Sequence, residues 1–202
     1  MSKPIILLGA GGHAKVLLDA LSCSADEVLG YVSPDASSSV LGIDYLGNDE
    51  SILRYAAEEV RLVIAVGDIG LRQRLFDAFK ARGYSFAPVI HPSAIISKDS
   101  VLGEGVQVMA GAVIQAGVRV QADVIINTRA SIDHDCHIDA HSHMAVGAIL
   151  AGDIGVGKRV LIGAGSTVIQ GVHVGDDSVV GAGAVVIRDV PAGRTVVGVP
   201  AH

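Results

Sequence analysis

The sequence predicts two domains of different construction: an α/β domain with a small Rossmann-like parallel sheet over residues 1–88, and a parallel β-helix of hexapeptide repeats over residues 89–202. Two patterns carry this prediction. Before residue 89, apolar strand-like runs alternate with amphipathic helical patterns, as in parallel α/β domains. From Ile90 to Val186 an aliphatic or Met side chain then recurs at every sixth residue. Neither a helix nor a flat strand keeps that period.

The first domain is expected to begin with a buried strand, Ile5–Leu8, a glycine turn and a helix over Ala14–Leu21. Strand and helix patterns alternate after that. The expected strands are Val28–Ser33, Leu62–Val66 and Phe86–Ile90, and the expected helices are Ser51–Glu59 and Leu71–Arg82. A parallel sheet of this kind binds its ligand at the carboxyl ends of the strands.

Three glycines, Gly9, Gly11 and Gly12, lie between the first strand and the first helix. Glycines at this place let a phosphate approach backbone N–H groups at a helix N-terminus, although the same residues also suit a plain tight turn. The segment departs from the dinucleotide fingerprint G-x-G-x-x-G, and only about four strands precede Ile90. A mononucleotide or a nucleotide sugar is therefore a better fit than NAD.

The hexapeptide period defines the second domain. Four residues after each periodic position stands a small or β-branched residue, from Ala94 to Val190. A triangular coil that turns a corner every six residues explains both positions, and stacked coils build the core that a single coil lacks. The periodic residues are Ile90, Ile96, Leu102, Val108, Ile114, Val120, Ile126, Ile132, Ile138, Met144, Leu150, Val156, Ile162, Val168, Val174, Val180 and Val186.

With three sides of six residues, residues eighteen apart stack at about the 4.8 Å spacing of neighbouring strands. The residue before each periodic position should point outward, which defines three outer columns. Two are mainly apolar, Ile95-Val113-Ser131-Ile149-Thr167-Val185 and Gln107-Ile125-His143-Leu161-Val179, and the third, Val101-Arg119-His137-Gly155-His173, is polar. Exposed apolar columns mark interfaces, so a cyclic homotrimer is expected, with the third edge in water.

Four histidines fall within the segment Asp133 to His143. His134 stands on a face, in a column with Ala116 and Gly152, and these small neighbours leave room for a ligand or cofactor beside its imidazole. The adjacent Asp135 could orient the ring and raise its basicity, as a catalytic base requires. The remaining surface histidines His137, His141 and His173 are expected to be solvated. Cys136 is expected to face the core, and no Ser–His pair is expected to be placed for an acyl-enzyme.

Composition narrows the class of protein. The net charge is −6 and no basic stripe is present, which argues against binding to nucleic acid. The two cysteines do not make a disulfide framework. The apolar run Ile5–Leu8 is too short for a membrane span and lacks the pattern of a signal peptide, so a cytoplasmic location is expected.

The chain resembles the sugar acyltransferases of the left-handed β-helix superfamily, in particular the nucleotide-sugar N-acetyltransferase and sialic acid O-acetyltransferase group. The resemblance covers essentially the whole chain. It rests on the hexapeptide repeats and on the segments Leu8-Gly9-Ala10-Gly11-Gly12-His13, Ile132-Asp133-His134-Asp135-Cys136 and Gly198-Val199-Pro200-Ala201. One departure is the end at His202, where relatives usually carry a few more residues after Pro-Ala.

The resemblance implies a left-handed coil, a homotrimer with active sites between subunits, and acetyl-CoA as the acyl donor. By position, His134 matches the family's general base and Asp135 its acidic neighbour. His143, Ala164 and Ala182 match positions that contact acetyl-CoA. Gly152 is also expected to lie beside this cofactor. The expected acceptor-binding residues are Gly11, Gly12, His13, Ser33, Pro34, Asp35 and Gly67.

The function expected from the resemblance is acetyl-CoA-dependent N-acetylation of a nucleotide-linked amino sugar, with a 4-amino-4,6-dideoxy sugar favoured. O-acetylation of sialic acid is an alternative. A metal hydratase of the γ-carbonic anhydrase type is more remote, because zinc there needs three histidines and the spacings of 3, 4, 7 or 9 residues do not match. No metal is therefore expected. A non-catalytic nucleotide-sugar-binding scaffold is a further alternative.

Overall fold

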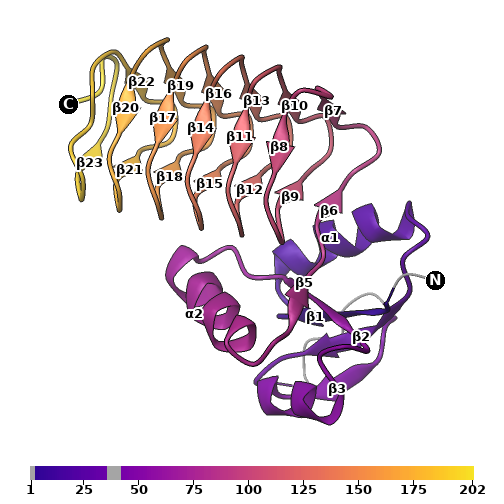
Figure 1. Ribbon diagram of the computed structural model, residues 1–202. Helices are drawn as coiled ribbons and strands as arrows, with labels where there is room; N and C mark the ends of the chain where they lie inside the picture. Colours follow the sequence, from indigo (N-terminus) through magenta and orange to yellow (C-terminus); the bar gives the residue numbers. More distant parts are fainter. Residues whose placement is uncertain (1–2, 36–41) are drawn as a thin grey trace. The chain divides into compact units, whose positions relative to one another are not determined.

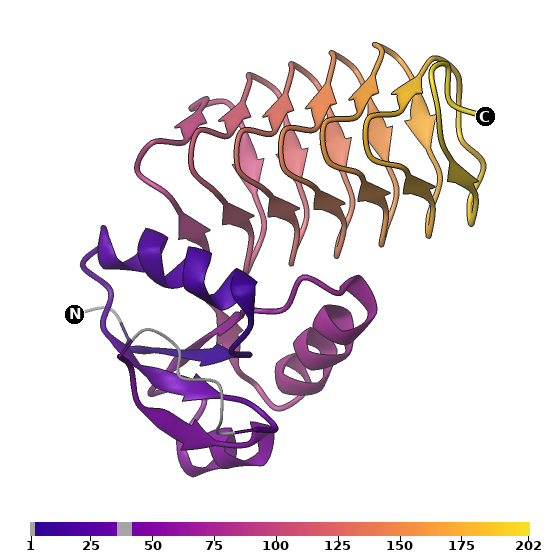
Figure 2. The same cartoon turned by 180° about the vertical axis from the view of Figure 1, so that it is seen from behind.

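The computed structural model describes residues 3–35 and 42–202, and the chain divides into two compact units, Met1–Ile90 and His91–His202. The first unit holds a parallel five-stranded sheet with the order β3-β2-β1-β4-β5 (Figures 1 and 2). Its strands are β1 (Ile5–Leu8), β2 (Val28–Val32), β3 (Tyr45–Gly47), β4 (Arg61–Ile64) and β5 (Ser85–Phe86), and its helices are α1 (Gly12–Ser22), α2 (Ile69–Lys80) and the 3₁₀ helix η1 (Asp49–Arg54).

The central strand β1 explains the stability of this sheet. All four of its residues are fully buried, because β1 pairs with β2 on one side and β4 on the other. A strand covered on both faces reads as a continuous apolar run, which is what Ile5–Leu8 is. The prediction of a small parallel α/β sheet is confirmed. No helix among the described residues is long and apolar enough to cross a membrane.

Three details of the first unit were predicted wrongly. The expected α-helix over Ser51–Glu59 is instead η1, because Tyr55 N–H bonds to the carbonyl of Ile52 and the hydroxyl of Tyr84 donates to the carbonyl of Tyr55. These bonds close the segment as a 3₁₀ turn and leave no α-helical continuation. Strand β3 was not foreseen, and the expected strand Phe86–Ile90 is two short strands, β5 and β6 (Val89–Ile90), interrupted at Pro88.

The second unit is a parallel β-helix whose strands are two residues long and form three sheets. Strand partners lie eighteen residues apart, as in Val113↔Ser131 and His137↔Gly155, except in the last pair of strands, where Val179 pairs with Thr195. One sheet contains β7 (Ile95–Ile96), β10 (Val113–Ile114), β13 (Ser131–Ile132), β16 (Ile149–Leu150), β19 (Thr167–Val168) and β22 (Val185–Val186). The second contains β8 (Val101–Leu102), β11 (Arg119–Val120), β14 (His137–Ile138), β17 (Gly155–Val156) and β20 (His173–Val174). The third contains β6 (Val89–Ile90), β9 (Gln107–Val108), β12 (Ile125–Ile126), β15 (His143–Met144), β18 (Leu161–Ile162), β21 (Val179–Val180) and β23 (Thr195–Val196).

The periodic aliphatic residues form the core of this unit, and Cys136 is buried among them. Ile90 is the exception, because it precedes the first complete coil and is 44% exposed. Two residues of the second apolar column were also predicted wrongly, because Gln107 and Ile125 are buried instead of facing outward into solvent. In the first column Ile95 and Ile149 are well exposed.

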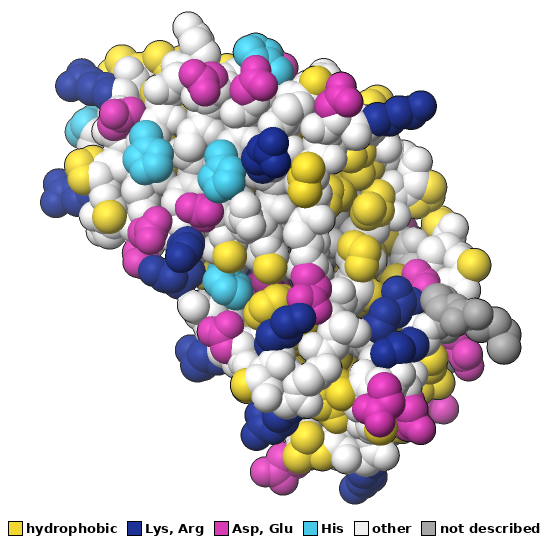
Figure 3. Space-filling view, viewed as in Figure 1, with side chains coloured by type: hydrophobic (Ala, Val, Ile, Leu, Met, Phe, Trp, Pro, Cys, Tyr) yellow, Lys and Arg dark blue, Asp and Glu magenta, His cyan; other side chains and the backbone are white. Residues whose placement is uncertain are grey.

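The face that carries β8, β11, β14, β17 and β20 is polar, as expected. Figure 3 shows histidine, acidic and basic side chains spread over this face. Arg119, His137 and His173 are exposed there, and the imidazole of His173 lies over Gly155, where a Cβ atom would collide with its Nδ1.

Candidate active site

His134 lies in the turn between β13 and β14, on the edge that joins the first sheet to the second. Asp133 orders the start of this turn, because its Oδ1 accepts the backbone N–H of His134 at 2.8 Å. Asp135 adopts a left-handed conformation with φ 60°, which short polar residues tolerate, and this brings its carboxylate to the imidazole. His134 Nδ1 donates to Asp135 Oδ2 at 2.9 Å. The proton on Nδ1 leaves Nε2 as the basic nitrogen of the neutral ring.

The surroundings of His134 favour its protonated form. The hydrogen bond to Asp135 is the largest cause and raises the pKa of His134 above its ordinary value. Desolvation opposes this effect and is the next largest cause, and the charges of Asp133, Asp135 and Asp153 add smaller upward shifts. The imidazole is nevertheless open to solvent, with 60% of its side chain exposed. A basic and accessible nitrogen is what a proton acceptor needs.

Gly152 lies one coil above His134, as the column arithmetic predicted. A Cβ atom at Gly152 would collide with Nε2 of His134, so the imidazole packs directly over glycine backbone. The two coils are tied together by the Asp153 N–H, which donates to the carbonyl of His134 at 2.9 Å. Only glycine at position 152 permits this ring position, which makes Gly152 a structural neighbour of the imidazole.

Asp133 and Asp153 were not singled out from the sequence. Asp153 stands eighteen residues after Asp135 and in the same left-handed turn conformation, with φ 57°. The column alignment that placed Gly152 above His134 could have found Asp153 above Asp135, because both follow from the same period.

His143 lies on β15, in the third sheet, and is half-buried. Its Nε2 is 3.1 Å from Nδ2 of Asn127. Because an amide NH₂ group can only donate, Nε2 accepts, and the ring carries its proton on Nδ1. Asn127 is held in turn by the backbone N–H of Thr128, which donates to its Oδ1 at 2.8 Å. Asn127 was not predicted as a partner of His143.

Ala164 and Ala182 are exposed and lie one coil apart, where the Gly183 N–H bonds to the carbonyl of Ala164. They follow β18 and β21, on the edge between the third sheet and the first. His134 occupies a different edge, between the first sheet and the second. A single chain therefore brings together His134, Asp135 and Gly152, but not Ala164 and Ala182 with them.

The acceptor residues predicted in the first unit gather at the carboxyl ends of three neighbouring strands. Gly11, Gly12 and His13 follow β1, where Gly11 caps α1 without a side-chain hydrogen bond and Cβ atoms at Gly11 or Gly12 would meet open space. Ser33, Pro34 and Asp35 follow β2, and Gly67 follows β4.

Hydrogen bonds order two of these loops. The hydroxyl of Ser33 donates to the carbonyl of Asp35 at 2.6 Å, and the hydroxyl of Tyr45 donates to the carbonyl of Ser33 at 3.2 Å. The carbonyl of Gly67 accepts from Arg72, a fully buried arginine of α2, at 3.3 Å. The strand ends are thus held by side chains from neighbouring elements.

A cavity of about 280 Å³ opens beside the end of β2, lined by Pro34, Asn48, Asp49 and Glu50. Burial raises the pKa of the Asp49 carboxyl. Asn48, Asp49 and Glu50 were missed because they follow β3, a strand that the sequence pattern did not reveal. The position at the carboxyl end of a strand is the signal that would have found them.

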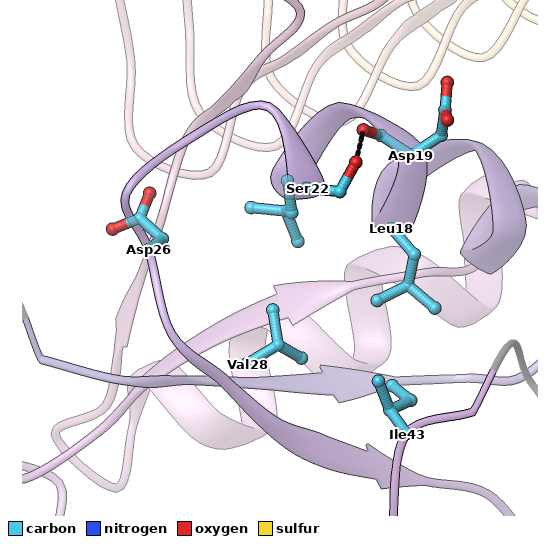
Figure 4. A pocket seen from close by; sticks show the side chains of 7 residues that line it. Leu18, Asp19, Ser22, Asp26, Val28 and Ile43 are labelled. Atoms are coloured by element: carbon cyan, nitrogen blue, oxygen red, sulfur yellow. Dashed lines mark hydrogen bonds between the residues drawn. The ribbon is translucent and has the colours of Figure 1, made fainter.

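A second cavity, of about 420 Å³, lies at the opposite end of the sheet. It is lined by the second half of α1, by residues at the start of β2 and by one residue before β3 (Figure 4): Leu18, Asp19, Leu21, Ser22, Asp26, Val28 and Ile43. Val28 begins β2, so this cavity lies at the amino end of the strand and contains no predicted acceptor residue. Its place in the sheet argues against an assignment as the nucleotide site.

One expectation about another residue was wrong. His141 is not solvated: it is buried, and its Nδ1 lies 2.9 Å from Oδ2 of the buried Asp123, eighteen residues earlier in the same column. A Ser–His pair also exists, Ser93 Oγ with His91 Nδ1 at 2.8 Å. That nitrogen also accepts the Ser93 N–H, and Ser93 Oγ accepts the Gly111 N–H, so the pair stabilises a turn. Within residues 3–35 and 42–202, no three His, Cys, Asp or Glu side chains are grouped to hold a metal.

Comparison with known protein families divides the chain as the fold does. Residues 4–79 match the family model of the PglD N-terminal domain, and residues 153–188 match that of the hexapeptide repeat of succinyl-transferase. UDP-N-acetylbacillosamine N-acetyltransferase of Bacillus subtilis (strain 168) is 37% identical over 112 residues. That match covers 54% of this chain and 52% of the Bacillus protein, about half the length of this curated relative.

Two solved structures are similar over the whole chain. PerB from Caulobacter crescentus, in complex with CoA and GDP-perosamine, is 41% identical with a TM-score of 0.94, covering 100% of this chain and 97% of PerB. The acetyltransferase domain of PglB from Neisseria gonorrhoeae, in complex with acetyl coenzyme A, is 35% identical with a TM-score of 0.93, covering 100% and 99%. These matches confirm the predicted left-handed β-helix and the α/β domain before it.

Proposed function

Because this chain belongs to the left-handed β-helix sugar acyltransferases, we propose that it transfers the acetyl group of acetyl-CoA to the amino group of a nucleotide-linked amino sugar, with a 4-amino-4,6-dideoxy sugar as the favoured acceptor. One observation carries the chemical part of the proposal: the imidazole of His134 is accessible, rests on Gly152 and donates through Nδ1 to Asp135.

In the proposed reaction the sugar amine reacts in its neutral form. Its nitrogen lone pair attacks the thioester carbonyl carbon and forms the new C–N bond, while His134 Nε2 takes the proton that the nitrogen must lose. Asp135 stabilises the imidazolium that results. The C–S bond then breaks, and the thiolate of CoA leaves and takes up a proton. No covalent enzyme intermediate is needed, since the thiol of Cys136 is buried in the core and donates to the carbonyl of Ala151.

The acetyl-CoA site is proposed along His143, Ala164 and Ala182, beside Gly152 of a second chain. The single chain supports this division, because its His134 edge and its Ala164 edge are different corners of the prism. A homotrimer would let the alanine edge of one subunit face the His134 edge of the next. The exposed apolar residues Ile95 and Ile149 are candidates for this contact.

The acceptor's nucleotide is proposed to bind at the carboxyl ends of β1, β2 and β4. Gly11 and Gly12 lie at the N-terminus of α1 without a side-chain cap, and open space stands where a side chain would lie, which suits the approach of a phosphate. The cavity beside Pro34 is lined by carboxylate and amide groups, which suit the hydroxyl and N–H groups of a nucleoside and would repel a diphosphate. The phosphates of the nucleotide are thus proposed to bind at Gly11 and Gly12, and its nucleoside in the cavity beside Pro34.

The proposal is tested by an assay of CoA release from acetyl-CoA with a panel of acceptors. The panel contains GDP-perosamine, UDP- and dTDP-linked 4-amino sugars, free sialic acid and CMP-sialic acid. We expect release with at least one nucleotide-linked amino sugar, and a product heavier by one acetyl group. Release with sialic acids alone would contradict N-acetylation and favour O-acetylation, and binding of nucleotide sugars without any release would favour a scaffold.

A further inference from the structure

Arg129 is an anomaly in the glycine pattern of the β-helix. On the edge between the third sheet and the first, one residue of each turn adopts a left-handed conformation, and four of the five successive turns use glycine there. These are Gly111 (φ 67°), Gly147 (φ 68°), Gly165 (φ 65°) and Gly183 (φ 69°). Arg129 holds the same place with φ 58°. A side chain at this conformation is strained unless another interaction compensates for it.

A second arginine, Arg159, has the same left-handed backbone conformation, and its side chain forms an ion pair that can compensate for the strain. Arg159 has φ 58° on a different edge, and its Nε and Nη2 donate to the two carboxylate oxygens of Asp177 at 2.5 and 2.7 Å. Arg129 is exposed and has no side-chain hydrogen bond or ion pair to any residue that the structure describes. Its strain therefore has no compensation within the described chain, and its guanidinium is available to a bound group.

The place of Arg129 associates it with the proposed donor groove. It follows Thr128, which stands in the column of Ala164 and Ala182, and Asn127, which holds the imidazole of His143. The turn is closed by the Ala130 N–H, which donates to the carbonyl of Asn127. The stem of Arg129 passes over Gly111 of the preceding coil, where a Cβ atom would lie 3.4 Å from its Cγ. The Cγ atom of Arg129 therefore lies beside the preceding coil of the same edge.

From these observations we propose that Arg129 binds a phosphate group of a substrate at this edge. The planar guanidinium forms paired hydrogen bonds with phosphate oxygens, and such charged hydrogen bonds are among the stronger ones in proteins. The inference rests on the proposed function, in which both acetyl-CoA and the nucleotide-linked acceptor carry phosphates. Phosphate oxygens are common to both substrates, so the test below separates CoA from the acceptor's diphosphate as the source of the bound phosphate.

Arg129→Gly is the informative variant, because glycine is the residue that the other turns of this edge use. We expect a melting temperature equal to or above that of the wild type, since the left-handed strain is removed. A loss of binding by this variant therefore cannot be attributed to misfolding. Arg129→Lys keeps the charge but removes the paired geometry, and Arg119→Ala, an exposed arginine on the polar face, serves as the control.

Binding is measured by calorimetry with CoA, dephospho-CoA, GDP, UDP and dTDP as probes, and KM is measured separately for acetyl-CoA and for the active acceptor. Arg129→Gly should weaken either CoA or the nucleoside diphosphates by about tenfold or more, with Arg129→Lys intermediate and Arg119→Ala unchanged. A rise in the acceptor's KM alone assigns the phosphate to the acceptor, and a rise for acetyl-CoA alone assigns it to CoA. The difference between wild type and Arg129→Gly should shrink at high salt.

Unchanged binding of every probe by Arg129→Gly would overturn the inference, as would dissociation of the oligomer in this variant without a change in probe affinity, because Arg129 would then serve a subunit contact. Failure of the proposed function would give a different experimental result. A wild-type protein that binds the probes but acetylates no acceptor loses the proposed function and still allows the Arg129 comparison. A wild-type protein that binds no probe contradicts both.

Discussion

The two units of this chain hold their functional residues by different means. In the β-helix, His134 is fixed by its own turn and by the coil on either side, because residues eighteen apart are direct neighbours. In the first unit, Gly11, Ser33 and Gly67 come from three separate loops that meet only because β1, β2 and β4 are adjacent in the sheet. The β-helix site is therefore local and repetitive, and the first unit's site depends on topology.

From this difference we expect the two units to have separate roles. A stack of short coils with a closed core is rigid and places a proton acceptor accurately, as general base catalysis requires. Loops at the ends of parallel strands present backbone groups that can adapt to one nucleotide or another. Substitutions in the β-helix turn should accordingly change kcat, and substitutions in the first unit's loops should change the acceptor's KM.

The largest effect is expected for His134→Ala. Loss of the proton acceptor should lower kcat by about 10² to 10⁴, because general base catalysis typically contributes that much. The KM and binding of acetyl-CoA should stay nearly the same, as for a group that acts in the transition state. Steady-state kinetics with both substrates varied would show this, and near wild-type kcat at neutral pH would remove His134 from the mechanism.

Gly152→Ala should come next, although it adds one methyl group. The new Cβ atom would occupy the place of His134 Nε2 and force the imidazole aside, and a displacement of about 1 Å at a catalytic group can cost 10² in rate. Gly155→Ala is a matched control, because its Cβ atom displaces the imidazole of His173 on the polar face in the same way. Equal activity of both variants would show that the ring position over Gly152 is not needed.

Gly11→Val probes the first unit. A side chain at Gly11 meets open space, so the fold should tolerate it, with a loss of about 1 kcal/mol from the poorer N-cap. The branched side chain would cover the backbone N–H groups and should raise the acceptor's KM by about tenfold, the value of one charged hydrogen bond, with little change for acetyl-CoA. An equal rise for both substrates would contradict the proposed division.

The smallest effect is expected for the exposed pair Arg159–Asp177. Asp177→Asn should lower the free energy of unfolding by less than about 1 kcal/mol at neutral pH. Arg159 lowers the pKa of Asp177 through its hydrogen bonds, so this stability is present above the carboxyl's pKa in the unfolded chain and is lost as the pH falls through the lower pKa of the folded state. Urea unfolding at neutral and acidic pH would show whether the difference disappears in acid.

The β-helix could be predicted almost completely, because one period determines the strands, the core and the columns. The position of Gly152 against His134 followed from that period alone. The failures concern the exposure of side chains, which the period alone does not determine. Ile90 precedes the first complete coil and is exposed, whereas Gln107 and Ile125 are buried at positions where the period predicts outward-facing side chains. His141 was misjudged because its column partner Asp123 was not considered.

The first unit was less predictable, because its site depends on long-range pairing. Strand β3 is three residues long and ends in glycine, so no alternation of apolar residues announces it. Without β3, the residues after it, Asn48, Asp49 and Glu50, could not be assigned to the carboxyl edge of the sheet. The hydroxyl of Tyr84 that ends η1 comes from a segment about thirty residues later, which no local pattern contains.

The coupling of His134 to Asp135 gives the most direct test of the proposed mechanism. The measurement is the pH profile of kcat/KM, which reports the free enzyme, for wild type, Asp135→Asn and the control Asp177→Asn. The hydrogen bond to Asp135 is the largest cause of the raised pKa of His134, so its loss lowers that pKa and the neutral base persists to lower pH.

The titration of the acceptor's amine is common to all three proteins and cancels in the comparison. We expect the acidic limb of the kcat/KM profile to move to lower pH in Asp135→Asn, with a reduced maximum. In Asp177→Asn the acidic limb should stay at the wild-type pH. An acidic limb at the same pH in all three proteins would show that the group that must be deprotonated is not His134.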